Sequence, residues 1–169
     1  KPYLKKGISV VGLEPSCILS FRDELPSLIQ SQSSDLLKEN SFTFEELLVK
    51  NVKNLKFKSL NEKILIHGHC HQKAFDVVKP IEQILNKVPE LKFETINTSC
   101  CGMAGAFGYD KSTYDISMKM ANDKLFPAIK KYKANIKVIA DGTSCRCQIK
   151  DGLNIQAIHL AKFLDNNII

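Results

Sequence analysis

Short apolar stretches rich in β-branched residues alternate with helical patterns along this chain. The stretches that predict strands are 8–13 (ISVVGL), 63–69 (KILIHGH), 91–97 (LKFETIN), 135–141 (NIKVIAD) and the shorter 154–158 (NIQAI). Parallel strands need crossover connections, and the helical segments between these stretches can supply them. The pattern therefore predicts an α/β fold with a mostly parallel sheet and flanking helices.

Helix signals fill the intervals between these stretches. Residues 43–46 (TFEE) form a capping box, which is typical of a helix start. Pro80 is expected to divide a long apolar segment, and Pro127 is expected to restart a helix at a first-turn position. The remaining helices are expected at 21–29, 71–87, from 112 onward and at 159–164.

The polar stretch 30–41 (QSQSSDLLKENS) resembles a linker. The chain starts without methionine shortly before a predicted strand, so we expect a piece of a longer polypeptide. The expected parts, packed together as one fragment, are the tail of a preceding repeat at 1–29, a linker and helix at 30–60, and a cysteine-rich domain at 61–169.

A weak similarity between two segments of the chain supports the repeat. The segments SVVGLEPSC and KVIADGTSC both contain a strand, an acidic residue, a turn residue and then Ser-Cys. Glu14 and Asp141 occupy the matching acidic positions. We expect their carboxylates to hold the turns through backbone hydrogen bonds.

Composition excludes several classes of function. The 169 residues are 44% hydrophobic, which is enough for one domain with a real core. The net charge is +6, but the lysines at 50–63 and 130–137 alternate with Asn and apolar residues, which favours solvated helix faces over nucleic-acid binding. Because no segment has the length of a membrane span or the pattern of a signal peptide, we expect a cytoplasmic protein, either free or peripheral to the inner membrane.

Every cysteine follows the carboxyl end of a predicted strand. In open α/β sheets ligands bind at that edge, and helix N-termini there lower thiol pKa values. An even number of cysteines can indicate disulfides, but adjacent and C-x-C cysteines in a chain with a full core favour metal binding or redox chemistry. The candidate metal ligands in this crevice are Cys17, Cys70, Cys100, Cys101, Cys145 and Cys147.

The segment 99–110 (SCCGMAGAFGYD) combines adjacent thiols with a mobile backbone. Adjacent cysteines are poor disulfide partners, but they can supply ligands to two metals of one cluster. Gly102, Gly105 and Gly108 would let the backbone pass close to inorganic sulfur and point amides at it. Their period of three does not match the GxGxxG dinucleotide fingerprint.

Three histidines are candidates for a role beside the thiols. His69 and His71 flank Cys70, and His159 lies where the last strand meets the last helix. Each is a candidate ligand, or a donor that tunes a thiolate. His67 lies inside a predicted strand and is expected to be a core histidine.

The order Cys70, Cys100-Cys101-Gly102 and Cys145-Arg146-Cys147 resembles the cysteine-rich CCG domain family. That family includes the heterodisulfide reductase B subunit and the iron–sulfur subunits of glycolate oxidase and anaerobic glycerol-3-phosphate dehydrogenase. The strings GLEPSC, HGHCHQKA, CCGMAGAFGYD, YDISMK and LFPAI are similar in particular to the C-terminal segment of fused FAD-linked 2-hydroxyacid (D-lactate-type) dehydrogenases. The final pair is C-x-C, whereas the family pattern has C-x-x-C.

This resemblance implies an electron-transfer domain that binds a [4Fe–4S]-type cluster or, in some members, a single Zn²⁺. It implies that a parent oxidoreductase oxidises a 2-hydroxyacid at FAD, and that the FAD lies in a missing part of the chain or in a partner subunit. The implied partners are an FAD-binding dehydrogenase domain, other iron–sulfur domains and, peripherally, a membrane electron-transport chain. An isolated fragment of this kind is not expected to be active.

Two alternatives stay open at this point. One is a zinc-bound structural or docking module, and the other is a metal-free thiol-redox site. Six clustered thiols exceed the four ligands of one tetrahedral zinc, which favours the cluster.

Overall fold

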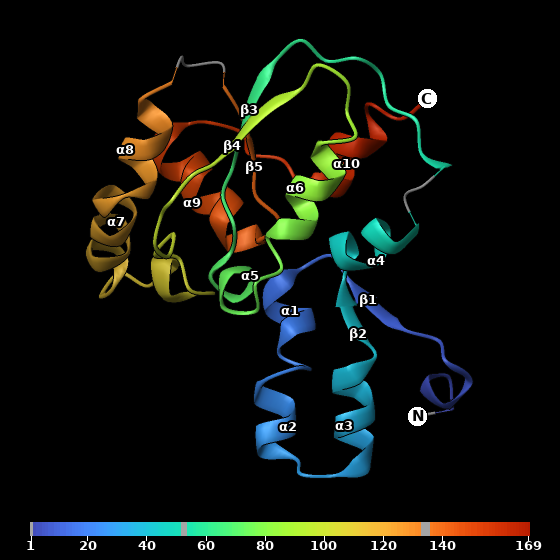
Figure 1. Ribbon diagram of the computed structural model, residues 1–169. Helices are drawn as coiled ribbons and strands as arrows, with labels where there is room; N and C mark the ends of the chain where they lie inside the picture. The colour runs from blue at the N-terminus through green and yellow to red at the C-terminus, as the bar shows by residue number, and fades with distance from the viewer. Residues whose placement is uncertain (1, 52–53, 133–135) are drawn as a thin grey trace.

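Two separate parallel sheets organise the chain in the computed structural model, which describes residues 2–51, 54–132 and 136–169 (Figure 1). The strands are β1 (Val10–Gly12), β2 (Ser41–Thr43), β3 (Lys63–Ile66), β4 (Lys92–Thr95) and β5 (Lys137–Ile139). The larger sheet has the order β4-β3-β5, and β1 pairs with β2 in the smaller one. The predicted α/β class with parallel strands and flanking helices is confirmed, although the first strand lies outside the main sheet.

Helices connect the strands and cover both faces of the larger sheet. In chain order they are η1 (Leu4–Lys6), α1 (Pro15–Leu19), α2 (Glu24–Leu28), α3 (Gln32–Glu39), α4 (Phe44–Asn51), α5 (Cys70–Ala74), α6 (Lys79–Leu85), η3 (Phe107–Tyr109), α7 (Tyr114–Asp123), α8 (Leu125–Lys130), α9 (Thr143–Leu153) and α10 (Leu160–Asp165). The predicted division at Pro80 is confirmed, because this residue lies in the first turn of α6 and α5 ends before it.

Two expectations about secondary structure were wrong in part. The stretch 30–41, expected to be a linker, forms α3 because the Ser31 side chain accepts a hydrogen bond from the Ser34 backbone and the Ser34 side chain accepts one in return. The expected strand at 154–158 contributes only a bridge between Ile158 and Ile139. Parts of the expected strand at 135–141 and of both lysine-rich segments lie outside the described residues.

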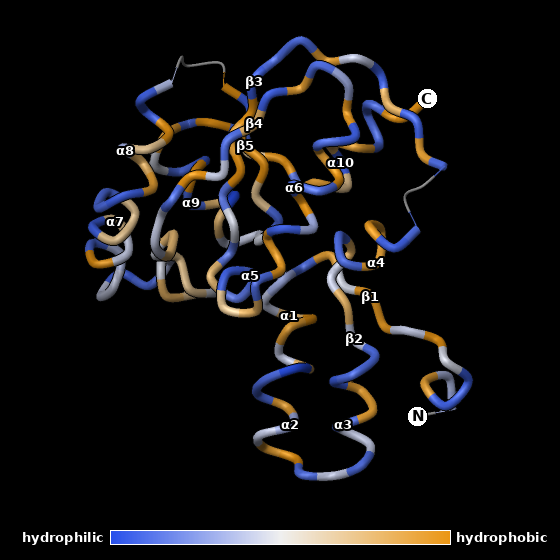
Figure 2. Tube along the Cα trace, viewed as in Figure 1, coloured by the Kyte–Doolittle hydropathy of each residue, from blue (hydrophilic) through white to orange (hydrophobic). Residues whose placement is uncertain are grey.

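The larger sheet buries both of its faces, as parallel sheets do. Leu65 and Val138 point to one side, where α7, α8 and α9 pack. Ile64 and Ile139 point to the other side, where α6 and α10 pack. Figures 1 and 2 show these two helical layers and the hydrophobic residues along the strands between them. This alternation follows directly from the two-residue period of a strand.

A smaller lobe, formed by residues 2–43, extends from the main sheet and ends in the pair α2 and α3 (Figure 1). Arg22 fixes it to α4, because its guanidinium donates two hydrogen bonds to the Glu46 carboxylate at 2.8 and 2.9 Å. The same side chain donates to the carbonyl of Ser41 at 2.8 Å. Both bonds come from one guanidinium nitrogen, and charge-assisted hydrogen bonds of this kind are stronger than neutral ones.

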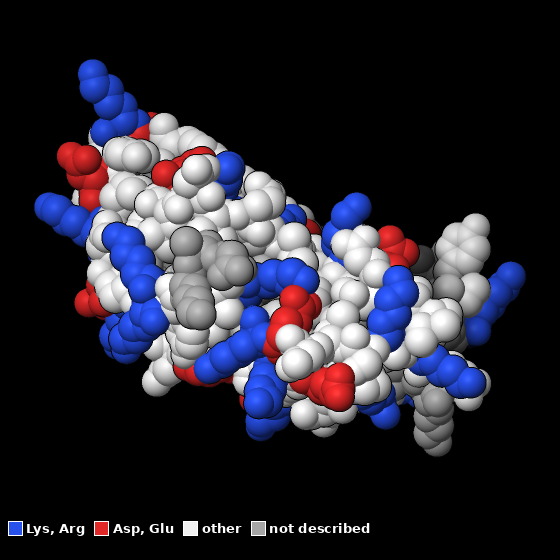
Figure 3. Space-filling view, turned by 90° about the horizontal axis from the view of Figure 1, so that it is seen from above, with Lys and Arg blue, Asp and Glu red and all other residues white. Residues whose placement is uncertain are grey.

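Charged side chains of both signs are interspersed on the surface. Lys63 pairs with Glu94 at 2.8 Å, and Lys137 pairs with Glu62 at 2.6 Å. The face shown in Figure 3 has Lys and Arg beside Asp and Glu rather than one basic patch. In the part of the chain that the structure describes, no helix has the length and apolar character needed to cross a bilayer.

Replacing Leu65 by alanine tests the central role of the larger sheet. Leu65 is fully buried, so the change leaves a cavity and is expected to lower the free energy of unfolding by about 2–5 kcal/mol. Urea denaturation measures this quantity. Ile116→Ala on α7 removes a similar side chain that is 51% exposed, and it is expected to change the value by about 0.5 kcal/mol or less. Equal losses in the two variants would contradict this core assignment.

Candidate metal centre

Three loops bring four cysteines to the same edge of the larger sheet. Cys70 is the first residue of α5, which follows β3. Cys100 and Cys101 follow β4, and Cys145 is the third residue of α9, which follows β5. Because β4, β3 and β5 are adjacent and parallel, their carboxyl ends meet at one edge, where ligands bind in open α/β sheets. The structure therefore brings together four of the six predicted cysteines.

The four thiols contact one another in a row. Neighbouring sulfurs of this set lie close enough to shift one another's pKa: Cys70 with Cys100, Cys100 with Cys101, and Cys101 with Cys145. The contacts with Cys101 and Cys70 lower the pKa of Cys100, and the contact with Cys101 lowers the pKa of Cys145. The pKa values of Cys70 and Cys101 are raised, because each of these thiols shares its proton with a neighbouring sulfur.

The row runs from the surface to the interior. Cys70 is exposed and Cys100 is half-buried, whereas Cys101 and Cys145 are buried. The backbone N–H of Gly102 donates a hydrogen bond to the Cys100 sulfur at 3.3 Å. Charged sulfur at Cys100 is thus stabilised by a backbone donor as well as by neighbouring thiols. All six cysteines of the chain are free thiols.

Two histidines lie beside the row. His69 is buried, and its ring nitrogens lie 3.8 and 3.9 Å from the Cys70 sulfur. His67 is also buried and its Nδ1 contacts the Thr98 hydroxyl at 2.9 Å, whereas its Nε2 has no hydrogen-bond partner. His67 also helps to lower the pKa of Cys145. The expectation that His67 is merely a satisfied core residue was therefore incomplete.

The other two candidate histidines contact the smaller lobe. The ring of His71 packs edge-on against that of His69, with the centroids 5.7 Å apart. Its Nε2 lies 3.5 Å from the Glu24 carboxylate of the smaller lobe, whereas its buried Nδ1 has no hydrogen-bond partner. His159 caps α10 by accepting from the Ala161 backbone at 2.9 Å, and its Nε2 contacts the Leu13 carbonyl at 2.7 Å. Both ring nitrogens of His159 thus serve structural contacts, one of them between the lobes.

The remaining two cysteines are Cys17 and Cys147, and Cys147 packs against the same core cluster as Cys101 and Cys145. Cys17 is exposed on α1, in a shallow hollow formed by residues 10–14 and the start of α1. Cys147 lies on α9 next to Tyr109, and this contact raises the pKa of Tyr109 to about 12. That these two cysteines also bind metal stays a prediction.

The glycines of the segment after Cys101 differ in their surroundings. Gly102 has a φ of +90°, and a Cβ there would overlap the carbonyl oxygen of Ser117. A Cβ on Gly108 would overlap the sulfur of Met103, whereas Gly105 faces open space. Gly102 and Gly108 therefore allow close packing within the protein. That these glycines let the backbone pass close to inorganic sulfur stays a prediction.

A buried polar network beneath the row was not found by sequence analysis. The Gln72 amide donates to Glu45 at 2.6 Å and to Asp141 at 3.0 Å, and its carbonyl accepts from the His69 backbone at 3.0 Å. The other oxygen of Asp141 accepts from the backbone of Leu160 at 2.8 Å. The capping-box pattern predicted a helix start around Glu45 but carried no signal that its side chain would be buried.

Glu14 and Asp141, the two acidic residues of the similar segments, accept hydrogen bonds from other elements and not only within their own turns. One oxygen of Glu14 accepts from the Thr143 backbone and hydroxyl, both at 2.8 Å, and the other accepts from Ser16 at 2.9 Å. Burial raises the pKa of Glu14, but the hydrogen bonds from Thr143 and Ser16 outweigh it, so that the pKa is lowered. Glu14 therefore connects the smaller lobe to the start of α9, which carries Cys145.

The donor set of the row is suited to soft metals. Thiolates are the ligands preferred by iron–sulfur clusters, zinc and copper(I), and four cysteines lie in a row here. Within residues 2–51, 54–132 and 136–169, no three His, Cys, Asp or Glu side chains surround one point as ligands of a single ion would. The four cysteines form a row, and the histidines that adjoin it are His67 and His69.

The fold and site define a thiol-rich α/β protein, and comparison with known proteins gives its relatives. The chain is 27% identical to one subunit of the anaerobic glycerol-3-phosphate dehydrogenase of Escherichia coli, over 91% of this chain and 39% of the relative. It is 28% identical to the D-2-hydroxyglutarate dehydrogenase of Haemophilus influenzae, over 86% of this chain and 15% of the relative. An iron–sulfur protein of Methanocaldococcus jannaschii is 31% identical over 69% of this chain and 24% of its own length.

These relatives confirm the resemblance predicted from the sequence. The chain is homologous to segments of dehydrogenases, of a dehydrogenase subunit and of an iron–sulfur protein. It spans about two fifths of the first relative and about one seventh of the second. No family model matches the chain, and no solved structure matches it significantly.

Gly102→Ala is expected to destabilise the segment that carries the adjacent cysteines. The new Cβ would overlap the Ser117 carbonyl, and the left-handed φ adds strain. Gly105→Ala is the matched control, because its φ is +66° but its surroundings are open. Thermal unfolding is expected to show a loss at least ~2 kcal/mol larger for Gly102→Ala than for Gly105→Ala. Similar losses in both variants would mean that the packing against Ser117 carries little weight.

The buried Glu45 predicts a dependence of stability on pH. Burial, with the nearby Asp141 charge, raises the pKa of Glu45 from 4.5 to about 7. Between these values the folded state keeps a proton that the unfolded state releases, so stability falls as pH rises. The fall amounts to about 3 kcal/mol, and Glu45→Gln is expected to remove it.

Urea denaturation of both proteins from pH 4.5 to 8 measures this difference. Glu39→Gln, at an exposed position of α3, is expected to keep the wild-type slope. A Glu45→Gln variant with an unchanged pH dependence would show that Glu45 ionises normally in the folded protein.

Proposed function

We propose that this chain is an iron–sulfur electron-transfer domain of an FAD-linked 2-hydroxyacid dehydrogenase or a related oxidoreductase. The observation that carries the proposal is the row of four thiols, which three adjacent strands deliver to one edge of a parallel sheet. The relatives support it, because one is named as an iron–sulfur protein and the others as a dehydrogenase or a dehydrogenase subunit.

The proposed ligands are Cys70, Cys100, Cys101 and Cys145. A cluster contains several metal ions, and each needs its own thiolate, so contiguous thiols suit it well. We propose a [4Fe–4S]-type cluster, which accepts and donates single electrons when bound.

The protein's own groups would tune such a cluster in three ways. The Gly102 N–H donates towards the Cys100 sulfur, and hydrogen bonds of this kind influence the potential of thiolate-bound clusters. The buried positions of Cys101 and Cys145 exclude water from one end of the row. The neighbouring rings of His69 and His67 offer further polar contacts to sulfur.

The FAD would bind to another part of the parent chain or to a partner subunit, and not to this domain. A 2-hydroxyacid would be oxidised to the 2-oxoacid, and its two electrons and two protons would reduce FAD to FADH₂. This domain would receive those electrons one at a time. We further propose that residues 1–29 complete a preceding repeat in a longer chain, which fits the partial coverage of the relatives.

Anaerobic reconstitution with iron and sulfide tests the proposal. We expect about four irons and four sulfides per chain, with broad absorption near ~400 nm that is typical of iron–sulfur proteins. Cys101→Ser is expected to lose most of this metal, because Cys101 contacts two other thiols of the row. Cys147→Ser is expected to retain it, and a similar loss there would add Cys147 to the ligands.

Two other results of this reconstitution would count against the proposed cluster. Binding of about one zinc per chain and no sulfide would favour the zinc-bound structural module instead. A chain that takes up no metal under either condition would contradict the proposed ligands and leave thiol-redox chemistry.

A further inference from the structure

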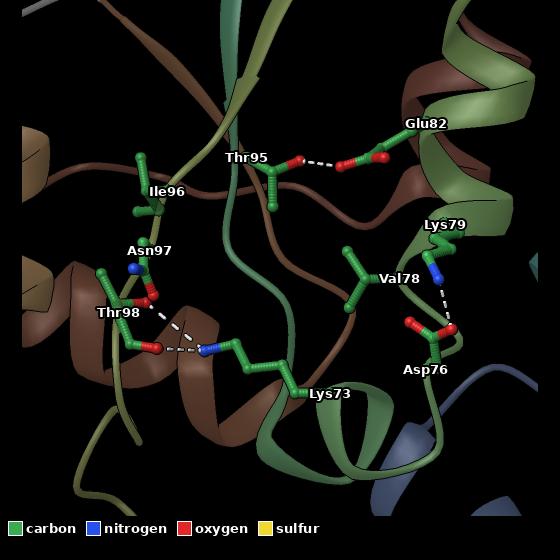
Figure 4. A pocket seen from close by; sticks show the side chains of 9 residues that line it. All are labelled: Lys73, Asp76, Val78, Lys79, Glu82, Thr95, Ile96, Asn97 and Thr98. Carbon is green, nitrogen blue, oxygen red and sulfur yellow. Dashed lines mark hydrogen bonds and ion pairs between the residues drawn. The ribbon is translucent and has the colours of Figure 1, made fainter.

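A pocket of about 350 Å³ lies next to the thiol row, between the α5–α6 segment and the end of β4 (Figure 4). Lys73 and Thr98 line one side of it, and Lys79 and Asp76 line the opposite side. Lys73 is one turn after Cys70 along α5, and Thr98 comes two residues before Cys100. The pocket wall is therefore continuous with the two segments that carry the first thiols of the row.

Lys73 connects these two segments directly. Its ammonium group donates to the carbonyl of Thr98 at 2.6 Å and to the carbonyl of Ser99 at 3.1 Å. Lys79 instead pairs with the exposed carboxylate of Asp76 at 2.5 Å. Lys73 thus binds backbone that leads into the adjacent cysteines, whereas Lys79 makes only a surface ion pair.

The charge of Lys73 also acts on the thiols. Burial lowers the pKa of Lys73, but the nearby sulfurs of Cys145, Cys70, Cys100 and Cys101 oppose that shift. No carboxylate pairs with this ammonium group among the salt bridges of the described residues. Its hydrogen bonds therefore go to the Thr98 and Ser99 carbonyls, and the four sulfurs are close enough to act on its charge.

We propose that Lys73 is a positioning residue of the candidate metal centre, which holds the 98–101 segment against α5 and supplies a fixed positive charge to the thiol-bound cluster. This inference rests on the proposed function. One-electron reduction adds negative charge to a cluster without breaking a bond, and a nearby cation stabilises the reduced form more than the oxidised form. Lys73 therefore raises the reduction potential.

The test compares Lys73→Met, Lys73→Arg and Lys79→Met in the anaerobically reconstituted chain. Potentiometric titration with dithionite as the one-electron reductant measures the midpoint potential. For Lys73→Met we expect the ratio of reduced to oxidised cluster at a fixed potential to fall about tenfold, which equals about 59 mV for a one-electron couple. Lys73→Arg keeps the charge and is expected to restore most of this ratio, while Lys79→Met is expected to match the wild type.

A second measurement does not depend on metal. Amide hydrogen exchange in the metal-free chain is expected to be about tenfold faster across 98–102 in Lys73→Met and unchanged in Lys79→Met. If Lys73→Met does not fold, as judged by circular dichroism, Lys73→Gln takes its place in both measurements.

The outcomes separate this inference from the proposed function. A cluster that assembles in the wild type but has the same potential in Lys73→Met and Lys79→Met overturns the role of the charge. Unchanged exchange across 98–102 overturns the positioning role. A wild-type chain that binds no cluster contradicts the proposed function, and the exchange measurement then still decides whether Lys73 holds the segment.

Discussion

Parallel pairing of β4, β3 and β5 is the constraint on which the rest of the structure depends. The register aligns Ile66 with Thr95 on one side and with Ile139 on the other, so the three strands end at the same level. The segments that follow them must therefore start side by side, and each carries at least one cysteine. Apolar residues on both faces of β3 lock this register, because a shift by one residue would exchange the two hydrophobic layers.

Desolvated polar groups then fix the segments around the sheet edge. Gln72 joins two buried carboxylates from separate elements, and Asp141 reaches the start of α10. Burying such groups is costly unless they are hydrogen-bonded, so each element accepts one arrangement relative to the others. Glu14 connects the smaller lobe to this framework in the same way, because its carboxylate accepts a hydrogen bond from Thr143 at the start of α9. The thiol row is thus held by a polar framework that comes from both lobes.

The part of the candidate site that depends on local sequence patterns was predictable. Strand ends followed by cysteines predicted the convergence of Cys70, Cys100, Cys101 and Cys145, and the structure shows it. Lys73 and Gln72 stood in the same segment as Cys70, but their roles depend on partners 25 and 69 residues away. His159 was a candidate from its place at the sheet edge, yet capping of α10 and a contact with Leu13 occupy its ring.

The sequence by itself determined the α/β class, the division of the chain at Pro80 and the placement of thiols after strands. These features follow from periodicity, proline geometry and the order of residues, all of which act over a few positions. Only the tertiary structure decided that the first strand joins β2 in a sheet of its own, that Cys17 is exposed whereas Cys101 and Cys145 are buried, and that Glu45 is buried. Each of these features depends on which distant groups pack together at the sheet edge and on the cost of removing their polar atoms from water. Local sequence patterns contain no information on either.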